Sequence, residues 1–178
     1  VPSDIAWGEM VKSLGDGNLD ERSLNLVSEA AFATNVFMST VSAMQLRIQP
    51  PNPADAHLNY RNVEIEPESL EEVIRFIAEL WKLNPKSISF RSLHQALAAR
   101  LLDIHQQSRL LGGIPGCSPA LISEKMPYIG LPVLDSVNQA LKAFDHAAGQ
   151  NDGIWALLLD EFEVAPAPLQ KDILTALR

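Results

Sequence analysis

The fold class is indicated by residues 154–161, which read IWALLLDE. Six apolar residues follow one another without alternation, Asn-Asp-Gly precedes them, and two acids follow them. A short apolar run bounded in this way is typical of a strand that is buried on both faces of a sheet. The stretch therefore predicts a central parallel strand over Ile154–Leu159 and an α/β fold.

Such a strand needs hydrogen-bonded neighbours on both sides, and the sequence offers few. The only weak candidates lie around Leu46–Ile48 and residues 62–65. We therefore expect the partner strands to lie outside these 178 residues. The expected fold is a partial three-layer α/β domain that is predominantly helical in this segment.

Two carboxylates, Asp160 and Glu161, come directly after the predicted strand. In open α/β sheets, ligands bind at the carboxyl ends of the strands. Asp160 can hold the water shell of a Mg²⁺ ion that bridges nucleotide phosphates, and Glu161 can orient or deprotonate the attacking water. This pattern predicts hydrolysis of ATP, with Glu161 as the catalytic residue and Asp160 as the cofactor-binding and metal-binding residue. The alternative interpretation is a buried strand whose end carries two solvated acids.

A family resemblance extends beyond the acidic pair. Residues 157–161 (LLLDE) resemble the Walker B element of P-loop ATPases, and residues 162–178 (FEVAPAPLQKDILTALR) resemble the bacterial origin-recognition-like branch of the AAA+ superfamily. The resemblance implies binding of ATP and Mg²⁺, a three-layer nucleotide domain and oligomeric assembly. It also leaves open a DNA contact through regions outside this sequence.

The chain departs from the P-loop pattern in one respect. It contains no G-x-x-x-x-G-K-[ST] loop, since neither Gly15-Asp16-Gly17 nor the glycines at 112–116 are followed by Lys-Ser/Thr. We expect the phosphate loop to lie before Val1, if the protein has one, and the chain to be a fragment of a longer protein.

Two other classes of protein compete with this interpretation. ATPases of the transporter and DNA-repair type also place Asp-Glu after an apolar strand, but their Ser-Gly-rich signature has no counterpart in residues 136–150. A non-enzymatic helical interaction module would show neither ATP binding nor a sheet around residues 154–159. Its partner face could be the weakly polar stripe Phe32–Met44, which most often would be core.

Apolar residues at helical spacing predict helices in most of the chain. One short helix is expected before Gly15 and a long one over Glu21–Ile48. Ser69-Leu70-Glu71-Glu72 forms the pattern of a capping box that opens a further helix, which Asn84-Pro85 ends.

Three further helices are expected in the second half of the chain. One carries the stripe from Phe90 to Leu111 and ends at Gly112-Gly113 in the left-handed conformation. Another runs from Val133 toward Gly149, and a last one opens at Pro168. The proline-rich segment 114–132 between them predicts an ordered loop or two short turns.

The proline cluster at 50–53 and these patterns suggest three parts. Residues 1–49 are expected to form an N-terminal helical part, residues 50–132 a helical insertion or sub-domain, and residues 133–178 the Walker B strand with its flanking helices. Protein partners, including a second copy of the chain, are expected to bind through helical faces.

Composition excludes several classes of protein. The chain has 14 Lys and Arg against 22 Asp and Glu, a net charge of −8, which argues against a broad, sequence-independent grip on nucleic acid. No apolar run reaches the roughly 18 residues that a membrane span needs, so no membrane partner is expected. The single cysteine, Cys117, favours a reducing cytoplasm, and it has no evident base that would make it catalytic. His94 and His105 are too far apart along one helix to share a metal.

Overall fold

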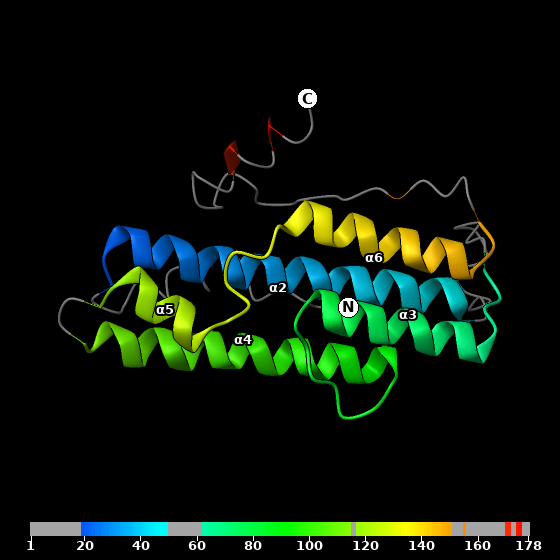
Figure 1. The fold of residues 1–178 in the computed structure, drawn as a ribbon, viewed down its shortest axis with the longest axis horizontal. Coiled ribbons are helices and arrows are strands. Elements are labelled where there is room, and N and C mark those ends of the chain that lie inside the picture. The colour runs from blue at the N-terminus through cyan, green and yellow to red at the C-terminus, as the bar shows by residue number, and fades with distance from the viewer. Residues whose placement is uncertain are drawn as a thin grey trace, which may run out of the picture. The chain divides into compact units, whose positions relative to one another are not determined.

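The structure is a computed structural model that describes residues 19–49, 62–114, 117–150, 155, 170–171 and 174–175. Its elements, in chain order, are α2 (Glu21–Ile48), α3 (Pro67–Leu80), α4 (Phe90–Gly112), α5 (Pro119–Lys125) and α6 (Val133–Ala147), as labelled in Figure 1. Within those residues every element is a helix and none is a strand. The predicted three-layer α/β fold is therefore wrong for this part of the chain, which is helical.

None of the three strand candidates is a strand in the residues that the structure describes. Of the predicted strand Ile154–Leu159, only Trp155 is described, and it lies in no regular secondary structure. Leu46–Ile48 belongs to α2, and residues 62–65 lie in no regular secondary structure. The expectation failed because a short apolar run reports burial and cannot by itself distinguish a sheet from a surface made by helices.

The chain divides into two compact units. Unit 1 comprises Val1–Asn35, Ala99–Leu134 and Leu157–Arg178, and unit 2 comprises Val36–Ala98 and Asp135–Ala156. Boundaries between the units therefore fall inside α2, inside α4 and in the first turn of α6. The division expected from the sequence, at 49/50 and 132/133, stays a prediction.

Unit 1 has a core of apolar side chains from α2, α4 and α5. Its buried members are Val27, Ala30, Ala31, Ile104, Leu111, Ile122 and Met126. Partly buried residues extend this core, among them Leu101, Cys117 and Tyr128. The three segments thus bury the stripes that the sequence predicted for α2 and α4.

Unit 2 is rich in buried aromatic residues. Phe37 and Trp81 are both completely buried and stack with ring centroids 4.4 Å apart and an interplanar angle of 7°. Phe90 and Phe144 form a second, tilted pair at 6.3 Å. The stripe Phe32–Met44 contributes to these interiors, since Phe32, Val36, Val41 and Met44 are also buried. The stripe is therefore core, which is the more common role of an apolar stripe on a helix.

Helix α2 confirms the long helix predicted over Glu21–Ile48. Its first turn is capped by Asp20, whose Oδ1 accepts the Ser23 N–H at 2.7 Å, and this bond lowers the pKa of Asp20. Farther along, the buried hydroxyls of Thr34 and Thr40 donate to the carbonyls of Ala30 and Val36 at 2.7 and 2.8 Å. These polar groups are therefore satisfied by their own helix.

The two ends of α3 differ from the prediction. The helix begins at Pro67, with Glu66 as an N-cap that makes no side-chain bond, so the predicted capping box at Ser69 is wrong. Proline at the first helical position fixes φ in the helical range and starts the helix three residues earlier than the predicted capping box would. The helix ends at Leu80 before Asn84-Pro85, because Lys82 adopts a left-handed φ of 51°.

The ends of the later helices show where glycine is used. The left-handed exit predicted at Gly112-Gly113 is wrong, since the described glycines with positive φ are Gly130 and Gly149. At the end of α6, Gly149 (φ 64°) donates to the His146 carbonyl and Gln150 donates to the Asp145 carbonyl. This is a Schellman arrangement, and it confirms the helix end predicted there.

Helix α5 lies inside the segment that was expected to be a loop. Ser118 caps it by accepting the Leu121 N–H, and Pro119 occupies its first turn. The sequence signal for this helix, Ser followed by Pro, was present but was obscured by the high proline content of the segment.

Candidate functional site

The predicted site residues Asp160 and Glu161 lie outside the described residues, so their roles stay predictions. The structure does describe Trp155, which precedes Asp160 by five residues in the sequence. Trp155 and its surroundings are therefore the part of this region that can be described.

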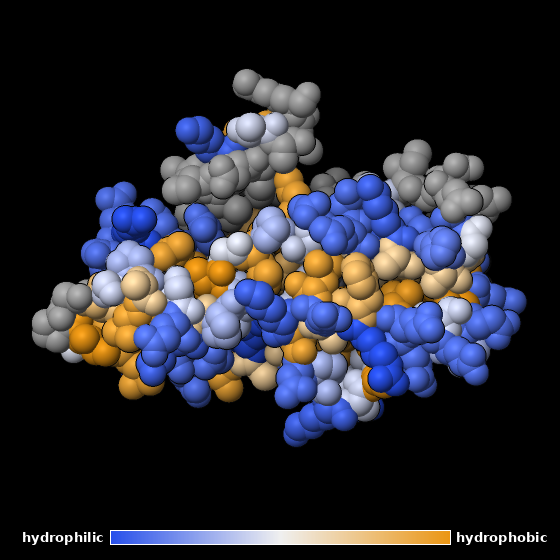
Figure 2. Space-filling model, viewed as in Figure 1, coloured by the Kyte–Doolittle hydropathy of each residue, from blue (hydrophilic) through white to orange (hydrophobic). Residues whose placement is uncertain are grey.

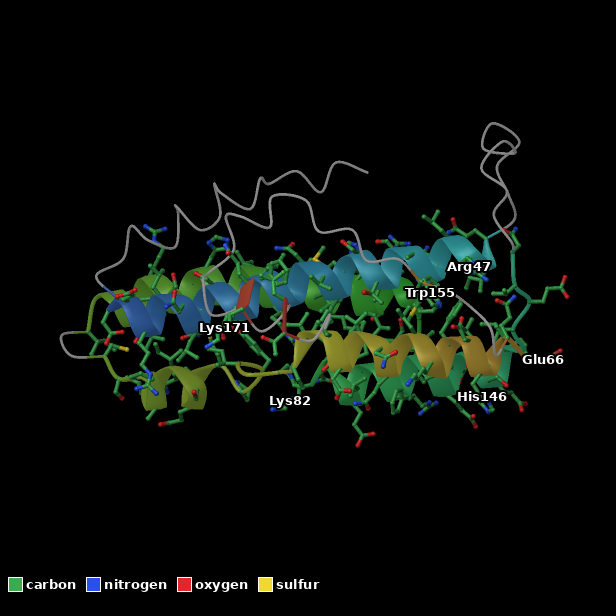
Figure 3. The ribbon with its side chains drawn as sticks, turned by 90° about the horizontal axis from the view of Figure 1, so that it is seen from above. Arg47, Glu66, Lys82, His146, Trp155 and Lys171 are labelled. Atoms are coloured by element: carbon green, nitrogen blue, oxygen red, sulfur yellow. The ribbon has the colours of Figure 1, made fainter. Side chains whose placement is uncertain are left out.

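Trp155 lies in a cluster of side chains that we call the Trp155 cluster: Arg47, Phe144, Asp145, Gln150 and Trp155. Its indole N–H donates to Asp145 Oδ2 at 2.8 Å. Its ring meets Phe144 edge-on, with centroids 5.8 Å apart and an angle of 78°. The Arg47 guanidinium carbon lies 5.2 Å from the Trp155 ring centroid, within cation–π range (Figure 3). The indole is thus held through its N–H, its edge and its face.

Two helix ends bring this cluster together. Arg47 is in the last turn of α2, where a cation is favoured by the helix dipole. Phe144 and Asp145 are near the end of α6, and the turn at Gly149 directs Gln150 back toward α2. Arg47 Nη2 donates to Gln150 Oε1 at 2.9 Å, which links the two helix ends.

The loop before α3 donates hydrogen bonds to carbonyl groups at the end of α2. The Val63 N–H donates to the Arg47 carbonyl at 2.8 Å, and Asn62 Nδ2 donates to the Gln49 carbonyl at 2.7 Å. These bonds satisfy carbonyl groups that a helix end leaves without partners. The backbone of Arg47 is therefore fixed as well as its side chain.

The side chains of the Trp155 cluster hold the indole in place and include no catalytic pair. It contains an aromatic donor, a carboxylate, a guanidinium and an amide, and none of these is a nucleophile paired with a base. Asp145 Oδ1 is buried and has no hydrogen-bond partner in the structure. A buried carboxylate oxygen of this kind makes the Trp155 N–H bond costly to lose, because its loss would leave the second oxygen unpaired too.

A second cluster of polar side chains lies in unit 1, between α4 and the turn after α5. Tyr128 donates its hydroxyl to Asp103 Oδ2 at 2.8 Å, and Gln107 Nε2 donates to Asp103 Oδ1 at 3.3 Å. The guanidinium carbon of Arg100, a buried residue, lies 4.6 Å from the Tyr128 ring centroid. The group ties the segment after α5 to α4.

Burial shifts two pKa values in this group. Desolvation lowers the pKa of Arg100 to about 10, partly offset by the nearby Tyr128 and Asp103. Desolvation, and then the hydrogen bond to Asp103, raise the pKa of Tyr128 above its usual 10.0. At neutral pH Arg100 is charged and Tyr128 is protonated, so neither is suited to proton transfer there.

The raised pKa of Tyr128 predicts a late tyrosine titration. The chain has two tyrosines, so the variant Tyr60→Phe leaves Tyr128 as the only one. We expect its absorbance at about 295 nm, the tyrosinate band, to rise only well above pH 10, the ordinary tyrosine pKa. Because the folded-state pKa is raised, the contribution of Tyr128 to stability is complete below about pH 10 and is lost as the pH rises through the folded-state value. Titration of the folded protein near pH 10 would contradict the burial of this hydroxyl, and the urea-unfolded protein is the control.

Other chemical candidates from the sequence do not form a site in the described part of the chain. There, no group of three or more His, Cys, Asp or Glu side chains could hold a metal ion, and His94 and His105 belong to no such group. Cys117 is half-buried against the unit 1 core, as expected of an incidental thiol. Its value as an indicator of a cytoplasmic location stays a prediction. None of the helices in the described ranges combines the length and apolar character that crossing a bilayer requires.

Exposed apolar side chains lie along the second half of α4 and just after its end. Leu102, Leu110 and Ile114 have exposed fractions of 59%, 65% and 45%, and Figure 2 shows apolar surface where α4 ends and α5 begins. Leu102 and Leu110 are eight residues apart, which places them on the same side of the helix. Apolar surface of this kind is typical of contacts with other proteins.

Sequence reasoning missed the Trp155 cluster. Arg47 and Gln150 are 103 residues apart, so no local pattern joins them. The one available signal was Trp155 itself, because the indole N–H of a tryptophan that is not fully exposed usually finds an acceptor. Sequence spacing does not identify that acceptor as Asp145, since Asp152 is the nearer acid.

Comparison with known proteins identifies the family. The family model described as ORC-CDC6-like matches residues 1–178, the whole of this sequence. The chain belongs to the ORC-CDC6-like family. No match was found among curated proteins or among solved structures. Membership of the ORC-CDC6-like family confirms the coarser part of the resemblance, an origin-recognition-like relative of the AAA+ ATPases, while the Walker B assignment stays a prediction.

Proposed function

We propose that the chain supplies the Walker B acids of an ATP-hydrolysing AAA+ protein of the ORC-CDC6-like family. The observation that carries this proposal is the match of the whole chain to that family, together with the Asp160-Glu161 pair after an apolar run. ATP and Mg²⁺ are the proposed cofactors.

The two acids have different proposed roles. Asp160 holds the hydrated Mg²⁺ that bridges the nucleotide phosphates, because a hard cation prefers carboxylate and water oxygens. Glu161 orients and deprotonates the water that attacks the terminal phosphate. Both roles depend on adjacent acids that approach the metal and the water from different directions.

The proposal requires a phosphate-binding loop, and the 178 residues contain no G-x-x-x-x-G-K-[ST] sequence. The experiments therefore use the full-length protein, with any residues that precede Val1. Partners through helical faces, including a second copy of the chain, are also proposed, and the exposed apolar residues of α4 support this part. A contact with DNA is proposed only for regions outside this sequence.

The first test is the Mg²⁺ dependence of ATP binding. In the full-length protein, Asp160→Asn should weaken ATP binding in the presence of Mg²⁺ and have little effect in EDTA, because the amide removes the charge that holds the metal. Isothermal titration with a non-hydrolysable ATP analogue measures both affinities. Asp135→Asn, a change at an exposed acid of α6, is the matched control and should behave as the wild type.

Two results would overturn the proposal. Equal loss of affinity with and without Mg²⁺ would show that Asp160 acts on folding and not on the metal. No ATP binding by the wild-type full-length protein would favour the helical interaction module instead.

A further inference from the structure

This inference rests on the part of the proposed function that concerns protein partners. We propose that copies of this chain associate through two unlike faces: the exposed face of the second half of α4 in one copy binds the acidic face of α3 in the next. The α4 face consists of Ala99, Leu102, Gln106, Arg109 and Leu110, and the α3 face consists of Glu68, Glu72, Phe76 and Glu79.

The α4 face belongs to unit 1 and is mainly apolar. Leu102 and Leu110 have exposed fractions of 59% and 65%. The members of this face recur at intervals of three or four residues, so they lie on one side of the helix. Arg109 carries the only exposed charge of residues 99–112, because Arg100 is buried and Asp103 is half-buried and accepts hydrogen bonds from its neighbours. The face is therefore apolar with one cation and no acid.

The α3 face belongs to unit 2 and carries the opposite charge. Glu68, Glu72 and Glu79 are exposed and share one side of the helix with Phe76, whose exposed fraction is 40%. The one cation of α3, Arg75, is paired with a further glutamate of the same helix at 3.5 Å. Three carboxylates around an exposed ring thus form a surface that suits an apolar face bearing a cation.

Charge complementarity selects a second copy of the chain as the occupant. Both faces are exposed in the single chain, so the contact is made to another molecule. Two α3 faces would bring only carboxylates together, and two α4 faces would offer Arg109 no acid, so contact between unlike faces is favoured. Such a contact is heterologous and leaves each end of the assembly with one open face, so assemblies can grow beyond two copies.

The small size of the two faces predicts a weak association. At 1.5 Å per residue, the α4 face is only about 17 Å long, and a helix is about 10 Å wide. The contact is therefore smaller than the roughly 800 Å² per partner of a standard interface. We expect a dissociation constant in the micromolar range that rises with salt, because salt screens exposed charges.

The first test is sedimentation equilibrium of the full-length protein without nucleotide. Arg109→Glu should weaken association at least about 10-fold, because the altered face repels the carboxylates of α3. Leu102→Asp should have an effect of similar size. Lys142→Glu makes the same change of charge at an exposed residue of α6, and this control should associate as the wild type does.

A second charge reversal distinguishes the contact from a loss of folding. The double variant Glu68→Lys/Glu72→Lys should also associate at least about 10-fold more weakly than the wild type. Adding Arg109→Glu to that chain should return the affinity to within about threefold of the wild type, because attraction is restored with the signs exchanged. A mixture of the two weakened proteins should associate for the same reason. Misfolding would not produce this recovery.

Three results decide the proposal. A wild-type protein that remains monomeric in the high micromolar range would overturn it. Association that Leu102→Asp abolishes but reversal of Glu68 and Glu72 leaves unchanged would also overturn it, in favour of contact between like α4 faces. If the protein hydrolyses no ATP but the expected recovery occurs, the proposed ATPase activity fails and the contact between α3 and α4 stands.

Discussion

In the full-length protein, Glu161→Gln should leave ATP bound and reduce its hydrolysis by roughly 100-fold or more, the range that loss of a general base produces. Glutamine keeps the size and hydrogen-bonding capacity of the side chain but cannot accept the proton of the attacking water. Binding should survive because Mg²⁺ is assigned to Asp160. Steady-state hydrolysis and equilibrium ATP binding, measured on the same preparation, check both halves of this expectation.

Glu163→Gln is the control for this substitution, since it makes the same chemical change two residues later. It should hydrolyse ATP at the wild-type rate. Wild-type hydrolysis in Glu161→Gln would refute the role of Glu161, and if Asp160→Asn were also without effect, the pair would be two solvated acids after an apolar run.

The largest stability effect is expected at Trp81. Its side chain is completely buried and stacks on Phe37, which is completely buried as well. Trp81→Ala should lower the free energy of unfolding by about 3–5 kcal/mol, because it removes the buried ring and leaves a cavity beside Phe37. Urea denaturation followed by circular dichroism measures this loss.

Phe76→Ala is the matched control, an aromatic residue of α3 with an exposed fraction of 40%. Because much of its ring is in water, its loss should cost clearly less than that of Trp81. Equal effects of the two substitutions would contradict the arrangement of α3 and Phe37 in unit 2.

The sequence predicted the long helices well, and the physical reason is their periodicity. Val73, Ile74 and Ile77 recur at helical spacing and are buried in α3, and Leu93, Leu97 and Ile104 do the same in α4. Such a stripe has few alternative conformations that bury all of its members at once. Helix ends were less predictable, because Pro67 and Lys82, and not Ser69 and Pro85, determine where α3 begins and ends.

The α/β class was wrong because it depended on a single run of residues. Ile154–Leu159 is apolar throughout, and such a run reports burial without reporting what covers it. The described member of the run, Trp155, is covered by side chains of helices. The Trp155 cluster could not be predicted, since the pairing of Arg47 with Gln150 depends on two helix ends meeting in space. The candidate acids come from the sequence alone.

The two buried threonines of α2 have a consequence for which substitutions the residues around them can accept. Thr34 and Thr40 return their hydroxyl protons to carbonyls one turn earlier in the same helix. A buried polar group that bonds to another helix requires a matching donor or acceptor there. The hydroxyls of these two threonines require none, because both bond within α2. Positions opposite the two threonines should therefore accept exchanges among apolar residues of similar volume, while the helix keeps its own polar groups satisfied.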